Sequence, residues 1–277
     1  MPKTIPTPRQ EPVLIAISDP DDPRIEAYRA VKERDLLGRQ HRFIAEGEVV
    51  LRVLLRQSRF EIESLLLGEG RVEGLNDALH SLPSEVPVYI ANRQVMDAIV
   101  GFPIHRGILA IAKRPVMPPV EALLAGLPEK ALVVVMVGLA NHDNVGGIFR
   151  NAAAFGADAV LLDQETCDPL YRKAIRVSVG GALVVPFTRA PSADVLVQAL
   201  EGASFEVIAL SPSGKEVLSE VQPARRTALL LGAEGLGLPP DLMARTRTVS
   251  IPMSGGFDSL NVATTSGIAL HHLTRGR

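Results

Sequence analysis

The chain has 277 residues, of which 47% are hydrophobic and 22% are charged, and this is the composition of a folded protein rather than a disordered one. Its 29 Lys and Arg against 31 Asp and Glu give a net charge of −2, so any surface that binds nucleic acid has to be local. The single cysteine, Cys167, excludes an internal disulfide and a CxxC zinc site.

Neither a membrane segment nor a metal site is indicated by the sequence. The longest apolar run, residues 131–140, is about half the length that a membrane-spanning helix needs. The N-terminal residues carry prolines and no apolar stretch typical of a signal peptide. None of the six histidines stands in an HExxH pattern. We therefore expect a cytoplasmic protein with no membrane partner and no metal.

The first part of the chain, residues 1–114, predicts a small α/β domain. Helical and strand-like patterns alternate along it, as short apolar runs separated by amphipathic stretches. The predicted elements are, in chain order, a helical stretch over 24–39, a strand at 43–45, a helix over 48–57, strands at 62–67 and 86–90, a helix over 92–99 and a strand at 107–112.

Basic residues are concentrated between Arg24 and Arg59. This segment contains nine basic and five acidic residues, which gives it a net charge of +4. Such a segment is compatible with a solvated helix face that carries ion pairs between residues i and i+4. The alternative is a surface that binds phosphate groups.

Prolines mark a connection after the first domain. Pro115, Pro118 and Pro119 lie within five residues and disfavour both a helix and a central strand. Residues 115–129 are therefore predicted as a stiff linker, with a short helical piece at about 120–125.

Residues 130–277 predict a second α/β domain, because near-continuous apolar strands alternate with helical segments. Strands of this kind are buried on both faces of a mostly parallel sheet, and the ligand site of such a sheet lies beyond the carboxyl ends of its strands. The predicted strands are 131–139, 159–162, 182–185, 205–210 and 228–231.

Three polar loops follow these strands. In the first, Asn144 is predicted to cap a helix, Gly146 and Gly147 permit a close approach of the backbone, and Arg150 lies within the helix. In the second, residues 232–237 combine three glycines with Glu234, which suits a backbone wrapped around a ligand. No dinucleotide-binding fingerprint results, because prolines follow where the phosphate-binding helix would begin.

The third loop brings polar residues to the start of the last predicted helix, which runs to about His272. Asp258, Ser259 and Asn261 stand there next to two glycines. A helix start needs only one capping side chain. The surplus of polar groups favours a binding loop.

Together these loops resemble the SpoU (TrmH) family of RNA 2′-O-ribose methyltransferases, within the SPOUT class. Residues 144–156 (NVGGIFRNAAAFG) are similar to the first motif of the family and residues 231–238 (LGAEGLGL) to the second. Residues 251–253 (IPM) with 259–262 (SLNV) are similar to the third. Residues 178–182 (SVGGA) also resemble a turn found in the family.

The resemblance covers residues 130–275, and the first domain more loosely resembles an L30e-like substrate-binding domain through residues 43–47 and 105–110. The sequence departs from the family pattern at three places, which bear on substrate choice more than on activity. These are residues 141–143, where Asp-Pro is frequent, Asn151, where Thr is common, and residues 264–266, where the family is richer in alanine.

The resemblance implies a C-terminal SPOUT domain with a mostly parallel sheet and a trefoil knot, a homodimer formed across the knot, and S-adenosylmethionine as the methyl donor. The residues that would bind the donor are Leu210, Ser211, Pro212, Gly232, Ala233, Glu234, Gly235, Gly237, Ile251, Pro252, Met253, Ser259, Leu260 and Asn261.

The resemblance also assigns catalysis to Arg150, supported by Asn144, Glu234, Ser259 and Asn261. Arg150 would either accept the proton of a ribose 2′-hydroxyl, or stabilise the developing alkoxide and hold a phosphate. The second role agrees with the usual chemistry of a guanidinium, which only donates hydrogen bonds. The residues expected to contact RNA are Arg29, Arg34, Arg42 and Arg150.

The expected activity is methylation of a ribose 2′-oxygen in structured RNA, with rRNA favoured over tRNA because of the L30e-like first domain. Two alternatives stay open at this stage. One is a catalytically inactive SPOUT-fold protein that binds RNA during ribosome assembly, and the other is a SPOUT enzyme that methylates a base nitrogen. The sequence leaves open which RNA and which nucleotide are modified, and whether both sites of a dimer act at once.

Overall fold

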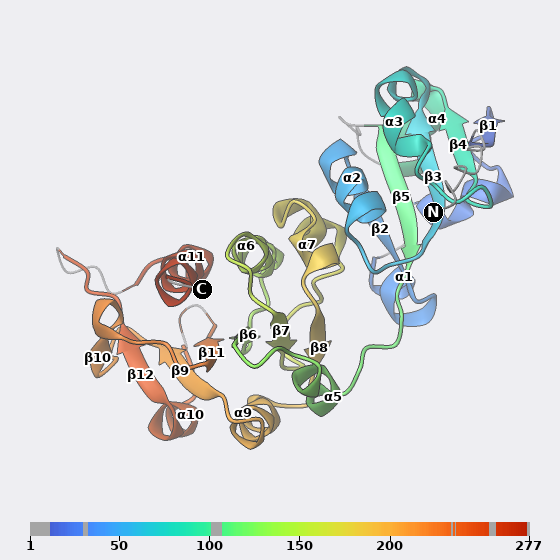
Figure 1. The fold of residues 1–277 in the computed structure, drawn as a ribbon. Coiled ribbons are helices and arrows are strands. Elements are labelled where there is room, and N and C mark those ends of the chain that lie inside the picture. Colours follow the sequence, from blue (N-terminus) through green and yellow to red (C-terminus); the bar gives the residue numbers. More distant parts are fainter. Residues whose placement is uncertain are drawn as a thin grey trace, which may run out of the picture. The chain divides into compact units, whose positions relative to one another are not determined.

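The computed structural model describes residues 12–29, 33–100, 107–233, 235, 237–254 and 259–275, without the side chains of 33–35 and 100. The chain divides between Pro115 and Val116 into two units, each with its own sheet and core (Figure 1). In the described residues no helix has both the length and the apolar character needed to cross a membrane.

The first unit contains a five-stranded mixed sheet in the order β1-β4-β3-β5-β2. Strands β1, β4 and β3 are parallel, whereas β5 is antiparallel to both β3 and β2. The strands are β1 (Leu14–Ile17), β2 (Arg42–Glu46), β3 (Ile62–Gly68), β4 (Val88–Ala91) and β5 (Ile108–Lys113). The α-helices are α1 (Glu33–Arg39), α2 (Glu48–Arg56), α3 (Asn76–Leu79) and α4 (Arg93–Val100), and short 3₁₀ helices span Pro23–Tyr28, Glu69–Arg71 and Glu73–Leu75.

Two features of the first unit differ from the prediction. The helical stretch expected over 24–39 is divided, with a 3₁₀ helix at Pro23–Tyr28 and an α-helix that begins at Glu33. Strand β1 was not predicted. It is a four-residue edge strand, LIAI, which is apolar throughout and therefore carries no alternation of apolar and polar side chains.

The second unit contains a seven-stranded sheet in the order β10-β12-β9-β11-β6-β7-β8, in which every described pairing is parallel. The prediction of an α/β fold with a mostly parallel sheet is confirmed. The strands are β6 (Ala131–Met136), β7 (Ala159–Leu162), β8 (Phe187–Arg189), β9 (Glu206–Leu210), β10 (Glu216–Val217), β11 (Arg226–Leu231) and β12 (Arg247–Ser250).

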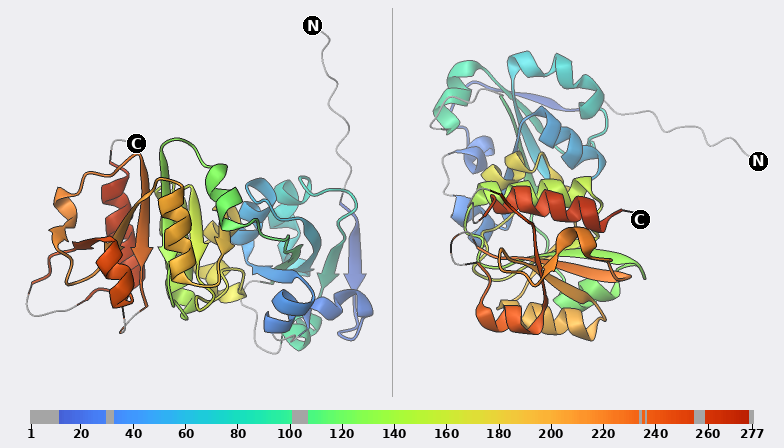
Figure 2. Two further views of the ribbon diagram at one scale, coloured as in Figure 1. Left: turned by 90° about the horizontal axis from the view of Figure 1, so that it is seen from below. Right: turned by 90° about the vertical axis from the view of Figure 1, so that its left-hand side faces the viewer.

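Helices cover both faces of this sheet. Helices α6, α7 and α11 lie on one face, and α5, α9 and α10 lie on the other (Figures 1 and 2). The helices are α5 (Val120–Ala125), α6 (His142–Ala154), α7 (Arg172–Val177), α8 (Gly181–Val184), α9 (Ala193–Gly202), α10 (Pro240–Arg245) and α11 (Val262–Leu273), with a 3₁₀ helix at Leu218–Glu220. The central strands β6 and β7 are buried along their whole length, as their unbroken apolar sequences predict.

The strand predicted at 182–185 is wrong. Residues Gly181–Val184 form helix α8, and the strand follows at Phe187–Arg189. Ala182 and Leu183 are fully buried in the helix, and a short apolar run of this kind looks the same in a buried strand and in a buried helix. A Cβ atom at Gly181 would lie 2.7 Å from the carbonyl oxygen of Phe149, so this glycine lets α8 pack directly on α6.

Residues 116–129, predicted as part of a linker, are grouped with the second unit. Helix α5 packs there, where Val120 and Leu124 are buried in the core beside α9. The trefoil knot and the L30e-like character of the first unit remain predictions from the resemblance.

Candidate active site

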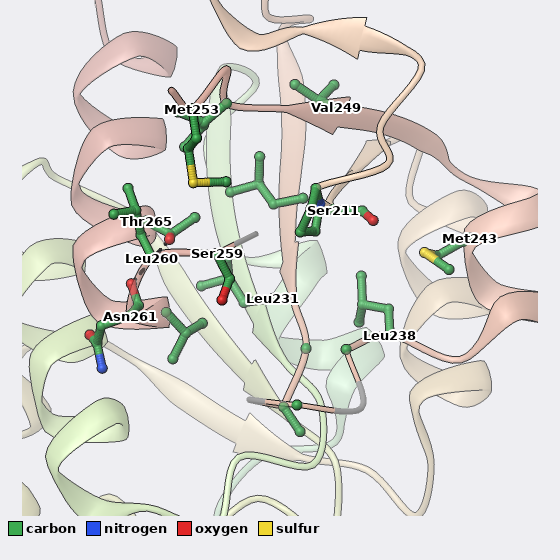
Figure 3. A pocket seen from close by; sticks show the side chains of 18 residues that line it. Ser211, Leu231, Leu238, Met243, Val249, Met253, Ser259, Leu260, Asn261 and Thr265 are labelled. Carbon is green, nitrogen blue, oxygen red and sulfur yellow. Dashed lines mark hydrogen bonds between the residues drawn. The ribbon is translucent and has the colours of Figure 1, made fainter. Parts of the chain in front are cut away.

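A cavity of about 650 Å³ lies at the carboxyl ends of β9, β11 and β12 (Figure 3). This is the edge of the sheet where the apolar strand pattern predicts a ligand site. The residues that line it are Leu210, Ser211, Pro212, Leu231, Gly232, Ala233, Gly235, Gly237, Leu238, Met243, Val249, Ile251, Met253, Ser259, Leu260, Asn261, Val262 and Thr265.

Most residues assigned to donor binding from the sequence are brought together at this cavity. Twelve of the fourteen line it, Pro252 is not among the lining residues, and Glu234 lies outside the described residues. Sequence reasoning missed six lining residues. Leu231, Leu238, Val249, Val262 and Thr265 directly flank or follow the predicted loops, whereas Met243 comes from α10, which no motif marks.

The loop after β11 is folded back on itself next to the cavity. The amide of Gly237 donates to the carbonyl oxygen of Ala233 at 2.9 Å. A Cβ atom at Gly232 would lie 2.6 Å from the carbonyl carbon of Gly237, so a larger residue cannot replace this glycine without moving the loop. Gly235 and Gly237 have φ values of +86° and +67°, which favour glycine. The glycines therefore shape a turn that presents backbone groups to the cavity.

The loop after β9 is attached to β12. The amide of Ser211 donates to the carbonyl oxygen of Val249 at 3.0 Å, and that of Gly214 donates to the carbonyl oxygen of Ser211 at 3.0 Å. A Cβ atom at Gly214 would collide with the backbone of Val249. These contacts hold the cavity-lining ends of β9 and β12 together.

The wall of the cavity is mainly apolar, with a few polar groups. Leu238 and Met243 lie on the side opposite α11, and Ser259, Asn261 and Thr265 supply hydroxyl and amide groups on the α11 side (Figure 3). Among the described lining residues no side chain carries a charge. Such a wall suits a ligand with a flat apolar part and a few positions for hydrogen bonds.

The beginning of α6 differs from the prediction. Its N-cap is Asn141, whose side-chain oxygen accepts a hydrogen bond from the amide of Asp143 at 2.9 Å. The prediction that Asn144 is the cap is therefore wrong, because the helix begins three residues earlier. Asn144 lies inside the first turn, where it is only 4% exposed.

Asn144 and Asn261 contact each other directly. The Nδ2 group of Asn261 donates to Oδ1 of Asn144 at 2.8 Å. The Oδ1 atom of Asn261 accepts from the amides of Ala263 and Thr264 at 3.0 and 3.3 Å, so Asn261 is the N-cap of α11. Two residues that are 117 positions apart in the chain thus join the start of α6 to the wall of the cavity.

Arg150 is exposed on α6. Within the described part of the chain, its side chain makes no hydrogen bond and no ion pair, so its guanidinium is available to a ligand. The two glycines before it serve helix packing. A Cβ atom at Gly146 would lie 2.8 Å from the carbonyl oxygen of Ala174 on α7, and one at Gly147 would lie 2.7 Å from Cβ of Ala263 on α11. The close backbone approach expected at these glycines is an approach to neighbouring helices.

Ser178, in the fourth segment of the resemblance, shapes a turn between α7 and α8. It is 2% exposed, and its hydroxyl donates to the carbonyl oxygen of Ile175 at 2.9 Å and accepts from the amide of Ala182 at 3.3 Å. Val179 and Gly180 both have positive φ values. The contacts of Ser178 are thus those of a structural residue.

Several arginines of the basic segment are neutralised by acids that lie outside it. Arg29 lies 3.1 Å from Asp21, and Arg42 donates to Glu63 at 2.8 Å. The side chain of Arg34 lies outside the described residues. The net charge of +4, counted along residues 24–59, therefore overstates the positive charge of this surface.

Arg52, in the same segment, forms ion pairs with two acidic residues. It donates to Asp77 at 2.7 Å and to Glu48 at 3.0 Å. The hydrogen bond from Arg52 lowers the pKa of the Asp77 carboxyl. The ion pairs expected from a solvated helix face are thus present here.

Cys167, His142 and Tyr171 are not among the residues that line the cavity. Burial raises the pKa of the Cys167 thiol to about 11, with a further contribution from Asp168. The rings of His142 and Tyr171 lie 4.6 Å apart. In the described residues no cluster of His, Cys, Asp and Glu side chains could hold a metal ion.

Comparison with known proteins assigns the chain to a family. Residues 131–271 match the SpoU rRNA Methylase family. An uncharacterized tRNA/rRNA methyltransferase of Mycobacterium tuberculosis is 39% identical over 94% of this chain and 91% of its own length. A 23S rRNA (guanosine-2′-O-)-methyltransferase of Escherichia coli is 27% identical over 83% of this chain and 97% of its own length.

Solved structures show the same fold. The AdoMet-bound rRNA methyltransferase of Sinorhizobium meliloti superimposes with a TM-score of 0.80 at 24% identity, over 95% of this chain and 98% of that one. The family match covers all seven strands of the parallel sheet, and it includes the cavity and α6. The chain therefore belongs to the SpoU rRNA methylase family and is an RNA methyltransferase.

Proposed function

We propose that this protein binds S-adenosylmethionine in the cavity and methylates a ribose 2′-oxygen in structured RNA, with rRNA as the favoured substrate. The observation that carries the proposal is the hydrogen bond between Asn144 and Asn261, which joins the helix of Arg150 to the wall of the cavity. The Escherichia coli relative, a 23S rRNA (guanosine-2′-O-)-methyltransferase, supports the choice of the 2′-oxygen and of rRNA.

The cavity fits S-adenosylmethionine by size and chemistry. Its volume of about 650 Å³ is within the range of small-molecule sites, roughly 300–1,000 Å³. The glycines of the loop after β11 leave the backbone accessible, and the leucine and methionine side chains offer an apolar surface for a purine ring. When bound, this cofactor supplies an electrophilic methyl group on a sulfonium. The residues that would hold it are those of 210–212, 232–237, 251–253 and 259–261.

Arg150 would act on the RNA. A ribose hydroxyl is a weak nucleophile, and it has to lose its proton as it attacks. Arg150 would either accept this proton itself, or leave it to pass to water. In the second case the several hydrogen bonds that a guanidinium donates in a fixed geometry would hold a phosphate and stabilise the developing alkoxide. Its exposure, with no partner in the described chain, supports this role. Asn144, Glu234, Ser259 and Asn261 would orient Arg150 and the nucleotide.

The direct test is transfer of labelled methyl groups from S-adenosylmethionine to total RNA from a strain that lacks the gene. We expect label in RNA with the native protein, almost none with Arg150→Ala, and only partial recovery with Arg150→Lys, which keeps the charge but not the planar group of donors. Nucleoside mass analysis should place the methyl group on the sugar. A methylated base nitrogen, or donor binding without any transfer, would contradict the proposal and favour the corresponding alternative.

Two parts of the proposal are tested separately. Transfer to purified rRNA is compared with transfer to purified tRNA, and we expect the larger rate with rRNA. The homodimer expected from the family resemblance is measured by sedimentation equilibrium of the native protein. A monomer at micromolar concentration would remove the dimer from the proposal and leave the reaction in place.

A further inference from the structure

Asn151, which follows Arg150, makes a second connection between α6 and α11. Its Nδ2 group donates to the carbonyl oxygen of Ala263 at 2.6 Å and to Oγ of Ser266 at 2.9 Å. The hydroxyl of Ser266 donates to the same carbonyl oxygen at 2.7 Å, and Ser266 is fully buried. The amide of Asn151 thus belongs to a closed group of hydrogen bonds at the first turn of α11.

The contacts between the two helices follow one face of α6. Asn144, Gly147 and Asn151 are three and four residues apart, the spacing of neighbours on a helix surface. Asn144 contacts the cap residue of α11, Gly147 lies against Ala263, and Asn151 reaches one turn further. The two amide side chains therefore fix α6 against α11 at two points, with a glycine between them that allows the close approach.

The same turn of α11 forms part of the cavity wall. Asn261, Val262 and Thr265 line the cavity, and the hydroxyl of Thr265 donates to the carbonyl oxygen of Asn261 at 3.0 Å. Ala263, which accepts from Asn151, stands between these lining residues in the sequence. A displacement of α6 from this turn would change the position of Arg150 relative to the wall.

We propose that Asn151 is a positioning residue that fixes Arg150 relative to the methyl donor site by holding α6 against the first turn of α11. The inference rests on the proposed function, in which Arg150 contacts the RNA and the cavity holds the donor. Misplacement of a reacting group by about 1 Å can reduce a rate about a hundredfold. Loss of the Asn151 contacts should therefore affect the rate of transfer more than the affinity for the donor.

The experiment compares three variants of Asn151 and one matched control with the native protein, and it adds a double variant with Arg150. Asn151→Ala removes the amide. Asn151→Asp keeps its shape but cannot donate to a carbonyl oxygen. Asn151→Thr keeps a hydrogen-bond donor on a shorter side chain. The matched control is Thr227→Val, which removes a buried hydroxyl bonded to the carbonyl oxygen of Ala224 at 3.0 Å, at the far end of β11 from the cavity.

We expect Asn151→Ala and Asn151→Asp to lower kcat for methyl transfer by about tenfold to a hundredfold, with the Kd for S-adenosylmethionine within threefold of the native value. Asn151→Thr should lose less activity than Asn151→Ala, because it keeps a donor. Amide hydrogen exchange over residues 262–270 in the absence of ligand should become faster in Asn151→Ala and not in Thr227→Val. In the Arg150→Lys background, which keeps part of the activity, Asn151→Ala should cost less activity than in the native protein, because its effect passes through the guanidinium of Arg150.

Three results would overturn the inference. These are a native-like kcat for Asn151→Ala, a loss confined to donor affinity, or losses that add in the double variant with Arg150. An inactive native protein would instead contradict the proposed function, and the positioning role would fall with it. Native activity combined with an unaffected Asn151→Ala variant would remove the positioning role alone.

Discussion

The side chain of Asn261 serves two purposes, since it caps α11 and bonds to the buried Asn144. Loss of an N-cap costs about 1 kcal/mol of stability, and a buried polar group that loses its partner costs about 1–3 kcal/mol. We therefore expect Asn261→Ala to destabilise the protein more than Asn144→Ala. The double variant should lose less stability than the sum of the two single-variant losses, because each single variant already removes the shared hydrogen bond. Urea unfolding of all four proteins measures this coupling, and strictly additive losses would show that the bond contributes nothing.

Cys167 should be an unreactive thiol. Its pKa is raised from 9.0 to about 11, mainly by burial, and only the thiolate reacts with alkylating reagents. At a pH below 9 the thiolate fraction is therefore about a hundredfold smaller than in a free cysteine, and it rises as the pH approaches 11. We expect alkylation of the native protein by iodoacetamide at pH 8 to be slower by about this factor than after unfolding in urea. Equal rates in both states would contradict the burial of the thiol.

At the scale of the helices, Gly147 sets the distance between α6 and α11. A Cβ atom there would lie 2.7 Å from Cβ of Ala263, and overpacking of this kind costs about 1–3 kcal/mol. We expect Gly147→Ala to lower the melting temperature and to weaken the binding of S-adenosylmethionine, because α11 carries part of the cavity wall. The matched control is Gly202→Ala at the end of α9, where a Cβ atom meets no other atom within 4 Å.

The control should keep donor affinity and gain stability, since alanine is a better helix former than glycine by about 1 kcal/mol. Calorimetric titration and thermal unfolding of both variants supply the two measurements. If Gly147→Ala binds the donor as the native protein does, the spacing of α6 and α11 has no influence on the cavity.

Elements with a strong local pattern could be predicted from the sequence, and those decided by packing could not. The strands β6 and β7 and the last four residues of β11 are unbroken apolar runs, and these strands were found within a few residues of their observed bounds. The region from Ala182 to Val185 is just as apolar, yet it forms α8, because contacts with α6 decide between helix and strand. The cap of α6 was misplaced for a related reason. Asn141 and Asn144 are both good capping residues, and only the structure distinguishes them.

The candidate site follows the same rule. Glycine-rich loops and polar clusters mark most of the cavity in the sequence, because those residue types are needed for tight turns and for hydrogen bonds. The contribution of Met243 depends on where α10 packs against the sheet, and nothing in its own sequence signals this. The pairing of Asn144 with Asn261 depends on the tertiary fold, which brings the first and third motifs together.

At the scale of the whole molecule, charge cannot be judged from one stretch of sequence. Arg29 and Arg42 belong to a segment that is positive when counted alone, but their acidic partners, Asp21 and Glu63, come from outside it. Ion pairs on the surface add only about 0–1 kcal/mol each to stability, so these arginines can exchange an acid for an RNA phosphate at little cost. Their predicted role in RNA binding is therefore compatible with the ion pairs.

The division into two units leads to a last prediction. Every described residue that lines the cavity lies between Leu210 and Thr265, within the second unit, and this unit has its own buried core. We expect a fragment of residues 116–277 to fold and to bind S-adenosylmethionine with a Kd within threefold of that of the whole chain.

Methyl transfer to RNA by this fragment should fall by more than tenfold in kcat/KM, because the fragment lacks the arginines of the first unit that are expected to contact RNA. The same comparison at low and high salt separates the two contributions, since lost phosphate contacts flatten the salt dependence of RNA binding. Unchanged transfer by the fragment would assign RNA recognition to the second unit alone, and a folded fragment without donor affinity would contradict the assignment of the cavity.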